Sequence, residues 1–245
     1  MAREIGDDIW VFDRPLSIFG LKIGTRMTAI RLEDGSLFLH SPVKLDDETR
    51  SELKELGPVR HAVAPNKVHH FFIGAYRETY PEARLYAAPG LPQKRKDIAF
   101  DEELGAEPPM VWAGQIDQEL FGGAPSMNEV LFYHRKSKTL LATDLLMNHV
   151  DNDSFFTRFW LRIMGLHRRF GSSRLVKTIT RDRAAARASR DRVLAWDVER
   201  ITVTHGVVLQ RAGNRMLREA LTWLDEAPHL EPSAGDPGGR DPSDR

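Results

Sequence analysis

The sequence has no cysteine among its 245 residues. This absence excludes disulfides, thiolate nucleophiles and every metal site that is built on sulfur ligands. Long runs of uncharged apolar residues are also missing, so no segment is expected to cross a bilayer as a helix. The first ten residues, MAREIGDDIW, carry acids and lack the apolar core of a signal peptide. We therefore expect a soluble, cytoplasmic protein whose metal ligands, if any, are His, Asp or Glu.

The chain also lacks an overall excess of charge: its formal net charge is +0. Residues 155–192 are an exception, because they contain 11 Lys and Arg and only two acids, Asp182 and Asp191, which gives this segment a net charge of +9. Such a segment can face an anionic partner or form a solvated helical surface. We favour the solvated surface, since no strand with interleaved aromatic residues points to a nucleic-acid partner.

Strand and helix patterns alternate along the chain, which is typical of an α/β protein. A hairpin is expected around Asp34-Gly35, and a helix that stops at Gly57-Pro58. The expected strands and hairpins are 9–13, 28–43, 59–65, 83–90, 129–148 and 199–206, and the expected helices are 46–57, 71–81, most of 151–197 and 214–224. We expect one domain over residues 1–225 with a helical insert at about 150–197, followed by a disordered tail, 226–245, that is rich in Pro and Gly.

Metal-competent side chains stand at three places where a strand gives way to a loop. They are the pair His69-His70, Asp144 in LLATDLL and His205 in ITVTHG. Strand ends that share one edge of a sheet often gather a ligand site, and imidazoles with one carboxylate suit zinc, iron or manganese better than calcium. The alternatives are two histidines without a metal, an aspartate that caps its loop, and a turn histidine bonded to the backbone. His134, beside a turn, is expected to be solvated.

Together with the order of elements, the segments TAIRLEDGSLFLHSPV, HAVAPNKVHH, LLATDLL and ITVTHG resemble the metallo-β-lactamase superfamily, and more narrowly a bacterial branch of it with a degenerate metal motif. The resemblance spans roughly residues 9–224. It implies a four-layer αββα sandwich.

The chain departs from the metal motif of that superfamily, H-x-H-x-D-H. With the last position on His70, the two leading histidines fall on Pro65 and Lys67, and the aspartate falls on His69. The loop FGGAPSMNEV, where a third family histidine is expected, contains none. The resemblance therefore implies that one of two metal sites is lost, and that His69, His70, Asp144 and His205 hold a single divalent ion.

Further candidates follow from the same comparison. Lys67 takes the place of a family ligand, so its ammonium group is a candidate for filling the vacated site or for binding a substrate anion. Glu129 and Asn128 lie near the lost histidine and are candidates for general base and hydrogen-bond donor. Arg158, in the basic segment, is a further candidate for binding an anionic substrate. Each of these residues can equally be an ordinary surface or loop residue.

We expect a mononuclear metal-dependent hydrolase that acts on a small or anionic ester, thioester or lactone. Zinc is the first choice of metal, with iron or manganese as alternatives. An iron-dependent redox protein with the same ligands and a degenerate binding module without catalysis are the other two hypotheses. The stripe of apolar residues from Phe155 to Met164 predicts core packing or a cap packed over the site, although a homodimer face or a shallow membrane contact stays open.

Overall fold

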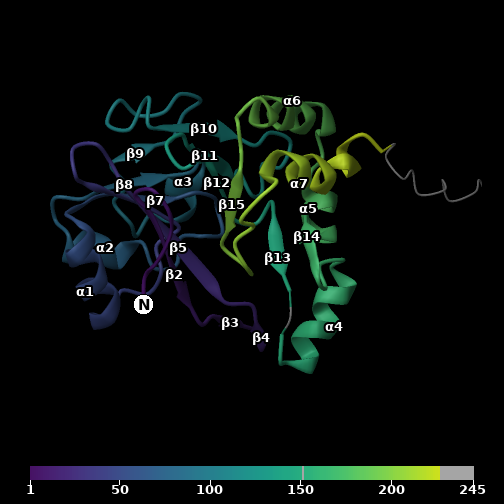
Figure 1. Cartoon of the computed structure of the whole chain (residues 1–245), viewed down its shortest axis with the longest axis horizontal. Coiled ribbons are helices and arrows are strands. Elements are labelled where there is room, and N and C mark those ends of the chain that lie inside the picture. Colours follow the sequence, from purple (N-terminus) through teal and green to yellow (C-terminus); the bar gives the residue numbers. More distant parts are fainter. Residues whose placement is uncertain (151, 227–245) are drawn as a thin grey trace, which may run out of the picture.

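The computed structural model describes residues 1–150 and 152–226. Two β-sheets pack face to face, and helices cover the outer face of each sheet. Figure 1 shows α1 and α2 on one side of the strands and α5, α6 and α7 on the other. The structure is thus the expected αββα sandwich.

The first sheet has seven strands in the order β1-β2-β5-β6-β7-β8-β9. Neighbours from β1 to β6 are antiparallel, and those from β6 to β9 are parallel, so the carboxyl ends of β6, β7 and β8 lie at the same edge. The strands are β1 (Arg3–Gly6), β2 (Ile9–Arg14), β5 (Thr25–Arg31), β6 (Leu37–His40), β7 (Val59–Ala64), β8 (Arg84–Ala87) and β9 (Glu102–Glu103).

The second sheet has four strands in the order β10-β11-β12-β15, of which only β12 and β15 are parallel. Two short pairs complete the strands: the hairpin β3–β4 and the pair β13–β14. The bounds are β3 (Ser17–Ile18), β4 (Leu21–Lys22), β10 (Ile116–Leu120), β11 (Val130–His134), β12 (Thr139–Ala142), β13 (Met147–His149), β14 (Arg169–Gly171) and β15 (Arg200–Val203).

Four of the described helices, α1, α4, α5 and α6, begin at an Asp or Ser cap, as their sequences favour. Asp46 accepts the backbone N–H of Thr49 at the start of α1, and Asp182 accepts that of Ala185 at the start of α6. None of the helices in the described ranges is long and apolar enough to cross a membrane. They are α1 (Asp47–Leu56), α2 (Gly74–Thr79), α3 (Leu91–Lys94), α4 (Phe155–Ile163), α5 (Arg174–Ile179), α6 (Arg183–Leu194), α7 (Gly213–Ala220) and the 3-10 turn η1 (Thr222–Leu224).

Aromatic residues join the two sheets in the middle of the sandwich. Phe38 of β6 meets Phe132 of β11 edge to face, with ring centroids 5.4 Å apart, and Trp112 packs on Phe38 at 5.0 Å. All three side chains are fully buried. This contact fixes how the sheets sit on each other, and hence where their strand ends meet.

The structure confirms most of the expected elements, including helices over most of residues 152–197, where α4, α5 and α6 lie. Within this segment β14 divides α4 from α5 by pairing with β13. Gly165, with positive φ, precedes β14, and Gly171, also with positive φ, ends it. The bounds of the domain and of its insert stay predictions, and the tail expected to be disordered lies outside the described residues beyond Glu226.

Replacement of Phe132 by alanine tests the inter-sheet packing. The change leaves a cavity between Phe38 and the second sheet, so the free energy of unfolding should fall by ~3–5 kcal/mol in denaturant titrations. Phe19→Ala is the matched control, because Phe19 is 95% exposed and its loss should change stability by less than ~0.5 kcal/mol. Equal effects of the two changes would contradict this packing.

Candidate metal centre and its cavity

Asp144 and His205 follow two neighbouring parallel strands at the same distance. Ala142 of β12 pairs with Val203 of β15, and each candidate stands two residues beyond its paired residue. Parallel pairing in register therefore carries the carboxylate and the imidazole to the same edge of the second sheet. The residue after His205 is Gly206 with φ 102°, where a Cβ atom would lie 2.0 Å from the carbonyl oxygen of Asn148. Only glycine permits this close approach.

His69 arrives from the first sheet, through the loop that follows β7. Asn66 in this loop is fully buried, and its Oδ1 accepts the backbone N–H groups of Val68 and His69 at 2.8 and 2.7 Å. These bonds turn the chain and fix the backbone of His69. The Nδ2 group of Asn66 donates to Oδ2 of Asp144 and to Oγ1 of Thr143, each at 2.8 Å. One amide thus ties His69 to Asp144.

Glu129 holds the loop that carries Asp144. Its carboxylate accepts the backbone N–H groups of Thr143, Asp144 and Leu145 at 2.7, 2.8 and 2.9 Å. The side chain is fully buried, and burial together with the nearby charge of Asp144 raises its pKa. Because both oxygens are engaged with the backbone, Glu129 positions the loop and is poorly placed to serve as the general base that the sequence suggested.

The ligand atoms of His69, Asp144 and His205 all lie within 4.8 Å of one another. Nε2 of His69 is 3.2 Å from Nε2 of His205 and 3.4 Å from Oδ2 of Asp144. Nε2 of His205 is 3.8 Å from Oδ1 of Asp144. The three side chains, which we call the His69 cluster, could hold one metal ion.

The outer nitrogens of both imidazoles are held by the surrounding structure. Nδ1 of His205 lies 2.8 Å from the carbonyl oxygen of Gly24, and Nδ1 of His69 lies 3.0 Å from Oγ of Ser41. A carbonyl can only accept, so Nδ1 of His205 carries the hydrogen and its Nε2 presents a lone pair to the cluster. Such partners orient metal-ligating histidines in many metal sites.

Burial and neighbouring charges shift the pKa values of all three side chains of the His69 cluster. Burial opposes the charge on His69, but the carboxylate of Asp144 raises the pKa of His69. Burial likewise opposes the charge on Asp144, while His69 lowers the pKa of Asp144. Burial and the charge of His69 lower the pKa of His205 to about 4. One proton on Nε2 of His69 therefore lies where the three ligand atoms converge, and a metal ion would displace it.

The His69 cluster lies at the wall of a cavity of about 370 Å³. Ser41, His70 and Thr25 are its other polar lining residues, and no lysine or arginine from residues 1–150 or 152–226 lines it. Apolar side chains make up the rest of the wall: Leu16, Ile18, Phe19, Leu21, Ile23, Pro42, Val68, Phe71, Phe72, Met147, Trp160 and Leu175. Most of them come from the hairpin β3–β4 and the residues beside it, the loop after β7 and the segment that contains α4 and α5, while Pro42 follows β6 and Met147 lies in β13. The cavity therefore suits an apolar, uncharged group.

His70 lines the cavity but stands outside the cluster. Its Nδ1 lies 2.6 Å from the guanidinium of Arg95, which can only donate, so the hydrogen of the neutral ring is on Nε2. Burial and the charges of Lys94 and Arg95 lower the pKa of His70 to about 4. Nε2 of His70 has no hydrogen-bond partner within the described residues. The arrangement brings three of the four predicted ligands together and leaves His70 bound to Arg95.

The remaining candidates lie away from the cavity. The ammonium group of Lys67 donates to the carbonyl oxygen of Pro125, and the amide of Asn128 donates to that of Pro89. Arg158 donates to the carbonyl oxygens of Asn152 and Asp153. None of Lys67, Asn128 and Arg158 is among the residues that line the cavity. The structure thus gives each of them a local partner in place of the anionic substrate suggested from the sequence.

Sequence patterns missed Asn66 and Ser41. Asn66 stands in a Pro-Asn-Lys loop that reads as an ordinary turn, although asparagine in such a loop often binds the backbone two or three residues ahead. Ser41 is buried with φ 54°, a conformation that is uncommon outside glycine and that clusters at functional sites. Its position directly after β6 was the available signal.

A family model described as a domain of unknown function, DUF4336, matches residues 6–154 of the chain. This match covers more than half of the sequence. The chain belongs to the DUF4336 family. Its matched region contains His69 and Asp144 but ends before His205. The parallel pairing of β15 with β12 brings His205 beside Asp144. No curated protein matches this DUF4336 chain at a significant level.

Solved structures show the fold of this DUF4336 protein to be that of the metallo-β-lactamases. The DIM-1 metallo-β-lactamase has a TM-score of 0.65 at 14% identity, with 92% of this chain and 96% of that chain covered. A metallo-β-lactamase from Pontibacter korlensis has a TM-score of 0.64 at 12% identity, with 93% and 99% covered. A flavodiiron core, Flv1 from Synechocystis, has a TM-score of 0.63 at 13% identity, with 92% of this chain and 61% of that chain covered.

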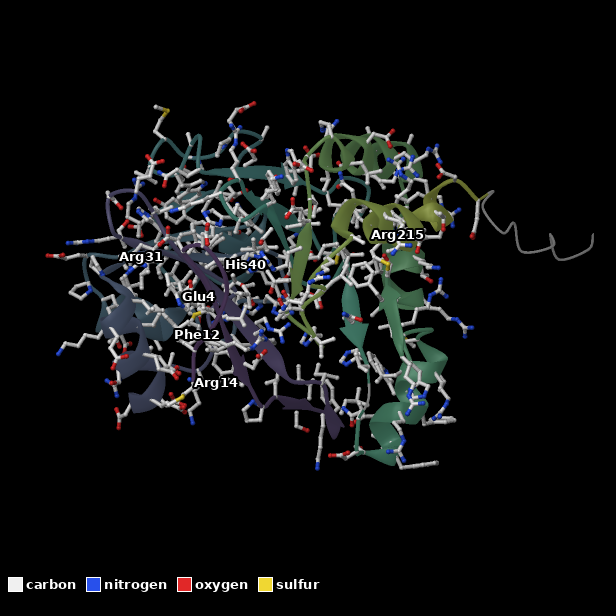
Figure 2. The ribbon with its side chains drawn as sticks, in the orientation of Figure 1. Glu4, Phe12, Arg14, Arg31, His40 and Arg215 are labelled. Atoms are coloured by element: carbon white, nitrogen blue, oxygen red, sulfur yellow. The ribbon has the colours of Figure 1, made fainter. Side chains whose placement is uncertain are left out.

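Besides His70, four histidines of the DUF4336 protein are buried outside the His69 cluster: His40, His61, His134 and His149. Figure 2 shows His40 among the strands. His134 was expected to be solvated, but it is only 3% exposed, with Nδ1 2.8 Å from Oγ of Ser137. Burial lowers the pKa of His134 to about 4.

The buried His134 predicts a loss of stability in mild acid. Its pKa is about 6.5 in the unfolded chain and about 4 in the fold, so between these values the unfolded state binds more protons. The free energy of unfolding should therefore fall as the pH drops through this window, by up to ~1.4 kcal/mol per pH unit from this residue. Denaturant titrations across the window should show a shallower pH dependence for His134→Gln. An unchanged slope would contradict the buried, neutral state of His134.

Proposed function

We propose that the His69 cluster binds one divalent metal ion and that the protein is a metal-dependent hydrolase. The observation that carries the proposal is the meeting of two imidazole nitrogens and one carboxylate oxygen, all within 4.8 Å, at the wall of an apolar cavity. Three protein ligands leave a coordination position for water or substrate, which is the pattern of catalytic zinc sites. The fold of the protein supports the proposal by analogy.

The donor set fits a metal of the zinc, iron or manganese class. Nδ1 of His205 is bound to a carbonyl and Nδ1 of His69 to a hydroxyl, so the two Nε2 atoms are the free ligand atoms. Oδ2 of Asp144 is oriented by Asn66, whose amide donates to it. A bound divalent ion would supply Lewis acidity at this wall of the cavity.

The residues around the cluster orient the substrate and donate a hydrogen bond to it. The apolar walls exclude water and orient an apolar acyl or aryl group, while the reactive carbonyl lies against the His69 cluster. His70 keeps a hydrogen on Nε2 because Arg95 occupies Nδ1, and this hydrogen is available to the carbonyl oxygen. A donor held in place before the reaction stabilises charge that develops on that oxygen.

The substrate class follows from the lining of the cavity. Because no lysine or arginine of the described residues lines it and most of its wall is apolar, we propose that the group bound there is uncharged and apolar. We propose an ester, thioester or lactone with a medium-length acyl chain, and we place the protein in the cytoplasm. Zinc is the first choice of metal. This proposal keeps the ester, thioester or lactone expected from the sequence, and it replaces the small or anionic group expected there with an apolar one.

A redox function with iron is the second candidate. Two histidines and one carboxylate are the ligand set of many non-haem iron oxygenases, and His69, His205 and Asp144 provide this set. The resemblance to the Flv1 flavodiiron core concerns the fold alone. Metal analysis of the purified protein separates the candidates, because zinc or manganese favours hydrolysis, whereas iron with visible absorbance favours redox chemistry.

Metal content of single variants tests the site. His205→Ala and Asp144→Ala each remove one of three ligands, so each should lose most of the metal that the wild-type protein carries. His70→Ala is the matched control, since Arg95 and not the cluster binds its Nδ1, and it should retain the metal. Equal metal in the wild type and in both ligand variants would rule out the proposed centre.

Hydrolysis of aryl esters with acetyl and octanoyl chains tests the proposed activity. The octanoyl ester should have the higher kcat/KM, because its chain can fill the apolar cavity. His70→Ala should lower kcat by ~10²-fold or more while the metal content stays unchanged. If neither ester is cleaved by metal-loaded protein, the hydrolase proposal fails even where the metal site stands.

A further inference from the structure

A group of large apolar side chains projects into solvent beside the cavity. Phe155, Phe156, Phe159 and Ile163 of α4, together with Phe19 at the turn of the hairpin β3–β4, are between 44% and 95% exposed. We call these five residues the phenylalanine patch. Phe155, Phe159 and Ile163 recur every four residues and so form one stripe on the helix. The sequence predicted that the apolar residues from Phe155 to Met164 form core or a cap packed over the site. The structure shows Phe155, Phe159 and Ile163 exposed, whereas Trp160 lines the cavity.

The helix and the hairpin form one continuous surface. The backbone N–H of Lys22 donates to Oγ1 of Thr157 at 3.0 Å, and the amide of Asn152 donates to the carbonyl oxygen of Lys22 at 2.6 Å. Thr157 faces inward and is fully buried, which leaves the opposite side of α4 outward. Figure 1 shows the hairpin β3–β4 reaching towards α4 at one edge of the molecule.

The segment that carries most of the phenylalanine patch is strongly basic. Residues 155–181 contain seven Lys and Arg and no Asp or Glu. Arg158 and Arg162 lie on α4 itself, between Phe155 and Ile163. Within the described residues neither arginine forms an ion pair with a carboxylate. Exposed aromatic side chains interspersed with cations are typical of helices that lie in the interface of an anionic membrane.

The charge also decides against a second copy of the chain as the partner. A twofold symmetric contact places the same surface of each subunit against the other. Here it would bring Arg158 and Arg162 of one copy close to the same two arginines of the other copy. Anionic phospholipid headgroups complement the cations, and the acyl chains below them complement the phenylalanines.

The patch borders the mouth of the cavity. Phe19 belongs to the patch and also lines the cavity, and Trp160 and Leu175, from the same segment as the patch, line it as well. We propose that the phenylalanine patch docks this protein on anionic phospholipid bilayers, with the mouth of the cavity towards the lipid. An apolar ligand then passes from the bilayer into the cavity without crossing water. The docking itself does not depend on the proposed hydrolase activity.

Co-sedimentation with vesicles tests the docking. Wild-type protein should bind vesicles of phosphatidylcholine and phosphatidylglycerol in equal parts, bind pure phosphatidylcholine far less, and be released by salt. Phe155→Ser combined with Phe159→Ser should weaken binding at least ~tenfold, because two aromatic rings leave the acyl region. Met110→Ser with Val111→Ser is the matched control: both residues are exposed but lie outside the patch, so binding should not change.

The charge contribution has its own pair of variants. Arg158→Gln with Arg162→Gln should weaken binding to the mixed vesicles by about tenfold or more. Arg215→Gln with Arg218→Gln removes the same charge from α7, away from α4, and should have a much smaller effect (Figure 2). Equal binding to both kinds of vesicle, or an equal effect of both arginine pairs, would overturn the proposal. So would a stable dimer in sedimentation analysis that Phe155→Ser with Phe159→Ser dissociates, because that result assigns the patch to a second copy.

Discussion

Asn66 uses both ends of one buried amide to connect the two sheets at the edge where their strands end. Its oxygen accepts the backbone N–H of His69, and its nitrogen donates to the carboxylate of Asp144. The backbone N–H of Asp144 in turn donates to the carboxylate of Glu129. A buried polar network of this kind is costly unless each member is satisfied, and here each one is. The positions of His69 and Asp144 in the cluster therefore depend on the hydrogen bonds of Asn66 and Glu129 more than on contacts among the three cluster side chains.

The site combines a polar wall with an apolar interior. His69, Asp144 and His205 come from loops after β7, β12 and β15, whereas most of the cavity is built from apolar side chains of the hairpin β3–β4 and the segment with α4 and α5. These apolar elements end in the exposed phenylalanine patch. One continuous stretch of the molecule therefore links the proposed metal centre, the proposed apolar substrate and the proposed lipid surface.

The sequence predicted the sandwich through its resemblance to the metallo-β-lactamase superfamily. It predicted the convergence of His69, Asp144 and His205 because each of them stands where a strand gives way to a loop. It could not predict that His70 turns to Arg95, because adjacent residues in a loop have no periodicity that fixes their directions. The role of Glu129 was also hidden, since it depends on three backbone N–H groups from another strand end. Likewise, an apolar stripe such as that of α4 looks the same in sequence whether a core or a membrane covers it.

The zinc affinity of folded Asn66→Ala tests the central claim most directly. The change leaves His69, Asp144 and His205 in place but removes the amide that orients Asp144 and the backbone of His69. Loss of such a partner should weaken zinc binding by ~10–100-fold, measured by titration against a competing chelator on protein whose circular dichroism matches that of the wild type. An affinity equal to that of the wild type would show that the buried amide does not organise the metal centre.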